Sequence, residues 1–131
     1  MRTHIVARFA AIVLGLQGLA ILALVVWQIW ALVAGDTGSF ESAVALVVLT
    51  AVGAVAVLAF AVATWRGQSW GRSGGIVTQL LVLAVAIGAM TGAYAEPAIG
   101  FALAVPAVAA LVLLVLAVRA AGRRAPGAAS E

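Results

Sequence analysis

The chain alternates between long apolar runs and short segments that carry its charged residues. Four runs contain no charged side chain, and they cover residues 9–34, 43–63, 76–94 and 98–118. A helix needs about 20 residues to cross a hydrocarbon core about 30 Å thick, and each run has about that length. The runs are continuously apolar, whereas barrel strands alternate over about ten residues. The pattern predicts an all-α membrane protein with four transmembrane helices in an up-down bundle.

Polar residues between the runs indicate where individual helices begin. The turn at 35–39 ends in Ser39, a suitable N-cap for the second helix, and Glu41 follows in the first turn, where the helix dipole favours an anion. Pro97 follows Glu96 and suits the first position of the fourth helix, because its missing N–H has no partner there.

Glycine and the tail composition predict the remaining boundaries. Gly74 and Gly75 are expected to break the chain before the third span, and Gly122 is a candidate C-cap for the fourth. Residues 123–131 are small, polar and contain Pro and Gly, so we expect a disordered cytoplasmic tail. Residues 1–122 then form the transmembrane domain, with an uncleaved first helix, since its apolar run exceeds that of a signal peptide.

The arginines predict the orientation of the bundle. Basic residues in short loops stay on the cytoplasmic side of a membrane. The seven arginines precede the first run, separate the second from the third, or follow the fourth; they are Arg2, Arg8, Arg66, Arg72, Arg119, Arg123 and Arg124. Asp36, Glu41 and Glu96 belong to the two opposite connections. We therefore expect a multi-pass protein of the plasma membrane with both termini in the cytoplasm.

Composition supports the membrane environment and excludes several chemistries. The 131 residues are 66% hydrophobic and 8% charged, which is more apolar surface than a soluble domain of this size can bury. There is no Cys, so thiolate metal sites, disulfides and Cys nucleophiles are excluded. The basic residues include no Lys, and Ala, Val, Leu and Gly dominate, as in proteins of GC-rich genomes.

A series of small residues marks one face of the third run. Ala84, Gly88 and Gly92 are spaced four residues apart, which places them on one face of a helix, and small residues allow two helix backbones to approach closely. Two interpretations remain open. The face either packs against another helix of the same four-helix unit or joins two chains.

Intramembrane polar residues are the second group of candidates. Gln17 lies deep in the first run and is expected to hydrogen-bond to another helix, because an unpaired amide in hydrocarbon is costly. Gln79 lies on the face opposite Gly88, and either bonds to another helix or lines a polar cleft. Thr50, in the second run, is a further candidate for a polar path.

The segment between the second and third runs combines two tryptophans with two arginines. Trp65, Arg66, Trp70 and Arg72 suit the headgroup region, where rings lie at the interface and guanidinium groups meet phosphate. The segment is interpreted as an interfacial anchor that sets the topology, or as a docking site for lipid or a partner.

This segment together with residues 76–81, Ile-Val-Thr-Gln-Leu-Leu, resembles small four-span integral membrane proteins of high-GC Gram-positive (actinobacterial) bacteria. The likeness rests on an Arg-rich loop with Trp, followed by a Gln and leucines at the start of the third span. Those proteins are uncharacterised, so the resemblance implies a topology and no mechanism.

The apolar runs hold no acidic, basic or His residue, which argues against proton or ion coupling. No metal, haem or other cofactor is expected, since His4 is the only histidine, and no enzymatic activity is predicted. The net charge of +3 is explained by arginine at the bilayer surface, so no nucleic acid partner is implied. We expect a structural or accessory subunit that acts through helix contacts, as a homo-oligomer or in a larger membrane complex. The alternative is a small oligomeric transporter or channel for a neutral or lipidic solute.

Overall fold

The computed structural model describes residues 2–129 and side chains within 4–123, and it consists of four α-helices. They are α1 (Arg2–Val33), α2 (Phe40–Trp65), α3 (Ser69–Thr91) and α4 (Pro97–Ala129). Each contains a stretch long and apolar enough to cross a membrane. No strand occurs in 2–129, so the predicted all-α four-helix architecture is confirmed.

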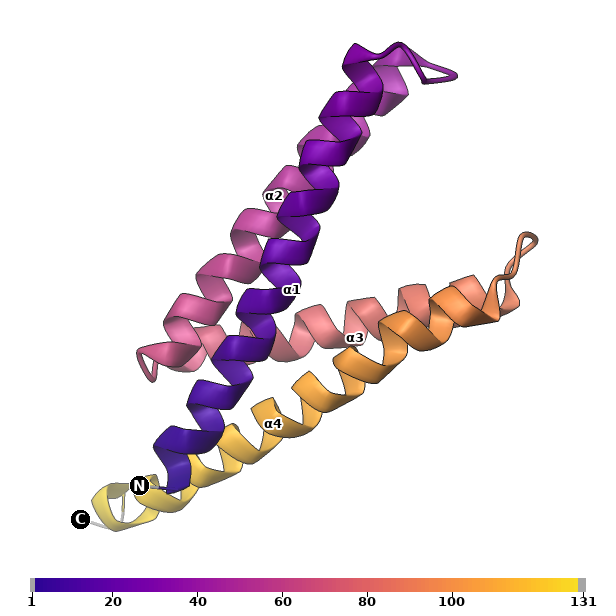
Figure 1. Ribbon diagram of the computed structural model, residues 1–131. Helices are drawn as coiled ribbons and strands as arrows, with labels where there is room; N and C mark the ends of the chain where they lie inside the picture. The colour runs from indigo at the N-terminus through magenta and orange to yellow at the C-terminus, as the bar shows by residue number, and fades with distance from the viewer. Residues whose placement is uncertain (1, 130–131) are drawn as a thin grey trace.

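The helices form two antiparallel hairpins that diverge. In Figure 1, α1 lies along α2 and α3 lies along α4, and the two hairpins spread apart toward the 34–39 and 92–96 connections. Both termini and the α2–α3 connection lie toward the end at which the hairpins meet (Figure 1). We call this the closed end and the opposite one the open end.

The core lies in the half of the bundle near the closed end. Leu14 of α1 and Leu114 of α4 are fully buried and pack in one cluster with Ala10, Val57 and Ala61. The arginines belong to the closed end, and Asp36, Glu41 and Glu96 to the open end (Figure 1). The up-down topology therefore places the arginines and these three acidic residues at opposite ends, as the arginine pattern predicts. Which end faces the cytoplasm stays a prediction.

Two of the predicted helix starts are confirmed. Ser39 has an extended backbone and its hydroxyl accepts a hydrogen bond from the Ser42 N–H at 3.5 Å, so it caps α2, with Glu41 in the first turn. Pro97 is the first residue of α4.

The expected break at Gly74 and Gly75 is wrong. Helix α3 begins at Ser69, and both glycines lie inside it. The connection is only 66–68, with Gly67 at a φ of +77°, a left-handed conformation that glycine adopts without strain. The two glycines remain helical because neighbouring side chains pack directly on their bare backbone, which offsets their low helix propensity. The third helix also ends at Thr91, earlier than the predicted 94.

The expected boundary at Gly122 is also wrong. Helix α4 passes through Pro106 and Gly122 and continues to Ala129, so backbone at 123–129 is helical where the composition predicted disorder. The segment contains Pro126 and Gly127, which are the poorest helix formers, so local propensity does not account for the continuation. Residues 130–131 of the predicted tail lie outside the described residues.

Candidate functional site

A reciprocal pair of amides joins the two hairpins. The Gln17 Nε2 donates to the Gln79 Oε1 at 3.1 Å, and the Gln79 Nε2 donates to the Gln17 Oε1 at 2.7 Å. Gln79 is fully buried. The interhelical bond predicted for Gln17 is therefore present, and its partner is Gln79, which lies 62 positions away in the chain.

The reciprocal pair uses half of the hydrogen-bonding capacity of the two amides. Each amide uses one N–H and one lone pair on the other, which satisfies the main demand of an amide in an apolar environment. Thr50 does not join them, because its hydroxyl donates to the Leu46 carbonyl one turn earlier in α2, at 2.7 Å. The three predicted intramembrane polar residues thus do not form one polar path in this conformation.

The glycines of α3 near the closed end lie in close contact with neighbouring helices. A Cβ added to Gly71 would lie 2.6 Å from the Ala63 Cβ and from the Thr64 backbone nitrogen. A Cβ on Gly74 would meet the Phe60 ring, and one on Gly75 would lie 3.0 Å from the Cδ1 atoms of both Leu14 and Leu114. These glycines allow α3 to approach α2 and the core.

The small-residue face of α3 has a different environment. Ala84 and Gly88 are exposed, and nothing lies within 4 Å of a Cβ added to Gly88. Helix α3 instead meets α4 through Ala86 and Met90, which contact Gly100. Packing of this face within the same four-helix unit is therefore wrong for the single chain, because α4 lies against another side of α3.

Gly92 does not continue that face. It is the C-cap of α3, with an extended backbone of φ −70° and ψ 175°, and its N–H donates to the Gly88 carbonyl at 2.7 Å. The surface that remains comprises Ala84 and Gly88, and we call it the α3 small face.

The residues predicted as an interfacial anchor occur on both sides of the short α2–α3 connection. Trp65 and Trp70 are each about half exposed, at 51% and 52%. The Trp70 ring meets the Phe60 ring edge-on at a centroid distance of 6.0 Å. Arg72 donates from Nη1 to the Gly67 carbonyl at 3.0 Å, and the Arg66 N–H donates to the Val62 carbonyl at 3.0 Å. The cluster is ordered by local bonds and leaves ring surface exposed at the closed end.

The sequence analysis missed one member of this cluster. The guanidinium carbon of Arg8 lies 5.0 Å from the centroid of the Trp65 ring, a cation–π contact between α1 and α2. The two residues are 57 positions apart in the chain, no periodic pattern links them, and only the folding of the hairpin brings them together.

Three apolar hollows lie beside the helices that carry the candidate residues. One of about 330 Å³ lies along α1 and α2 and ends at Trp65. Two others, of about 580 and 270 Å³, adjoin one another between the hairpins and share Val57, Thr78, Val82 and Leu103. Gln17 lines the smaller of these two.

Residues that could hold a metal ion do not gather in the described part of the chain, where no group of three His, Cys, Asp or Glu side chains occurs. No protein-family model, curated protein or solved structure matches the chain. The fold defines its class as an integral membrane protein with four candidate spanning helices.

Proposed function

We propose that this protein is a structural or accessory subunit of the plasma membrane, with both termini cytoplasmic, that acts through helix contacts with a second copy or a larger membrane complex. The resemblance to small actinobacterial four-span proteins is part of this proposal. So is the absence of enzymatic activity, which rests on the lack of acidic, basic and His residues in the four apolar runs.

The contrast between two sets of glycines carries the proposal. Gly71, Gly74 and Gly75 are covered by neighbouring helices of the same chain, whereas Gly88 is open. Apolar helices have no hydrophobic drive to associate in lipid, so close backbone packing at small residues is a main source of their attraction. The α3 small face is a surface of that kind that the chain itself leaves unused.

The amide pair supports this proposal over the alternative of a solute path. A transporter for a neutral solute needs polar groups that exchange partners with the solute, and Gln17 and Gln79 are instead bonded to each other. The pair acts as a fixed contact between hairpins, as a structural role requires.

The test is the size of the protein complex in mild detergent for the variant Ala84→Ile/Gly88→Ile. We expect most of the larger species to disappear, because branched side chains would hold a partner helix away from the α3 backbone. Gly92 is left unchanged, since a Cβ there would lie 2.7 Å from the Gly88 carbonyl oxygen of its own helix and would disturb the helix end.

Two control variants separate assembly from folding. Gly88→Ala keeps the face small and should retain the complex. Ala23→Ile makes the same change as Ala84→Ile at an exposed position of α1 and should also retain it. A complex of unchanged size in the double variant would refute the α3 small face as the contact surface. Solute flux into liposomes that is lost in Gln79→Leu would favour the transporter instead.

A further inference from the structure

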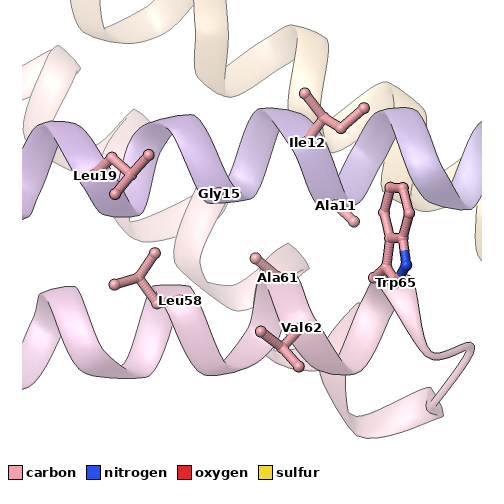
Figure 2. A pocket seen from close by; sticks show the side chains of 8 residues that line it. All are labelled: Ala11, Ile12, Gly15, Leu19, Leu58, Ala61, Val62 and Trp65. Atoms are coloured by element: carbon pink, nitrogen blue, oxygen red, sulfur yellow. The ribbon is translucent and has the colours of Figure 1, made fainter.

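A groove runs along the outer surface of the α1–α2 hairpin near the closed end. It has a volume of about 330 Å³. Figure 2 shows the Trp65 ring at one end beside Ala11, and Leu19 and Leu58 facing each other at the other end. Gly15 and Ala61 lie between these ends, and their small side chains leave the middle of the groove open.

The groove owes its depth to these small residues. A Cβ added to Gly15 would lie 4.0 Å from the Ala61 Cβ, an ordinary contact, so the space above the two backbones is open. Apart from the indole nitrogen of Trp65, the side chains that line the groove are apolar. An occupant must therefore be an apolar chain or surface.

One end of the groove differs chemically from the rest. Arg8 lies over the Trp65 ring, with 5.0 Å between the guanidinium carbon and the ring centroid, and the Arg8 side chain is exposed. Arg66 follows Trp65 directly. In a membrane-spanning bundle this end lies at headgroup level, where Trp rings and Arg side chains are favoured.

No carboxylate of the described chain neutralises this positive end. The acidic residues Asp36, Glu41 and Glu96 belong to the connections and helix starts of the open end, at the other ends of the helices (Figure 1). A second copy inserted in the same orientation would place its own Asp36, Glu41 and Glu96 at the open end as well. Within residues 4–123, the exposed cation at Arg8 therefore has no complementary carboxylate at its own end of the helices.

We propose that this groove is a binding site for an anionic phospholipid of the leaflet at the closed end. One acyl chain lies in the groove over Gly15 and Ala61, and the lipid phosphate contacts the Arg8 guanidinium held over Trp65. The site is independent of the α3 small face, which belongs to the other hairpin.

Charge and shape together favour a lipid over other occupants. A phospholipid carries an anionic group at headgroup level joined to an apolar chain that runs toward the bilayer centre, and the structure places a cation and an apolar groove in that order. A partner helix would fill the groove without supplying an anion at headgroup level. A free phosphate has no apolar part that could be buried in the groove.

The experiment counts lipids retained by the purified full chain in native mass spectrometry, after equilibration with equal amounts of phosphatidylglycerol and phosphatidylcholine. We expect phosphatidylglycerol to be retained preferentially. Arg8→Gln should lower its retention about fivefold, the factor for one basic residue near an anionic surface. Gly15→Leu fills the groove without touching Arg8 and should lower the retention of phosphatidylglycerol as well.

Arg119→Gln is the matched control, because it removes one charge from α4, which contributes no residue to the groove, and it should leave retention unchanged. Glycerol phosphate, which lacks acyl chains, should not be retained. Equal retention of the two lipids, equal losses in Arg8→Gln and Arg119→Gln, or unchanged retention in Gly15→Leu would each overturn the proposal. Retained glycerol phosphate would assign the site to a free anion and overturn it too.

Discussion

Replacing Gln79 with Leu tests whether the amide pair holds the two hairpins together. The change removes both hydrogen bonds, of 3.1 and 2.7 Å, and leaves the Gln17 amide without its partner between the hairpins. Interhelical hydrogen bonds in membrane proteins contribute about 0.6 kcal/mol on average. Two bonds give about 1.2 kcal/mol, and the orphaned amide adds a desolvation cost on the order of 1 kcal/mol.

We therefore expect Gln79→Leu to lower the free energy of unfolding by about 2 kcal/mol. Gln17→Leu should cost a similar amount. The double variant should cost clearly less than the sum of the two, since no buried amide is left unpaired, with a coupling of about 1 kcal/mol or more.

The measurement is a double-mutant cycle from reversible unfolding in detergent micelles, followed by tryptophan fluorescence. Thr91→Val is the control for loss of a polar group, because the Thr91 hydroxyl donates only to the Ile87 carbonyl of its own helix, at 2.8 Å. Its effect should be within about 0.5 kcal/mol. Strictly additive losses in the cycle would refute the view that the two amides act as one interhelical contact.

Two further predictions concern helix packing and orientation. Gly71→Ala places a Cβ 2.6 Å from the Ala63 Cβ and should destabilise the protein by about 1–3 kcal/mol. Gly88→Ala places its Cβ in open space and should leave the melting temperature in detergent nearly unchanged or slightly raised. Equal effects of the two substitutions on the melting temperature would contradict the packing. The chain has no Cys, so single cysteines at Gln68 and Gly38 report orientation through an impermeant thiol label on intact cells. Gly38→Cys should be labelled and Gln68→Cys should not, and the reverse pattern would show that the termini are outside.

Hydropathy determined the number of helices, but it misplaced the start of α3 and the end of α4. In hydrocarbon every backbone polar group must be bonded within the segment, so a continuous apolar run of sufficient length has the helix as its only solution. Ser39 and Pro97 determined the starts of α2 and α4, because the start of a helix depends on residues within its first turn. The order of arginine-bearing and acid-bearing connections then required an up-down topology.

The tertiary structure decided which face of each helix packs. A soluble helix reveals its buried face by the contrast between apolar and polar positions, but here nearly all faces are apolar and the contrast is absent. The spacing of the glycines therefore did not predict which of them contact another helix. Gly74 and Gly75 contact side chains of neighbouring helices, while Gly88 stays open. The pairing of Gln17 with Gln79 and the contact of Arg8 with Trp65 join residues far apart in the chain. They depend on how the helices pack, which a local sequence pattern does not predict.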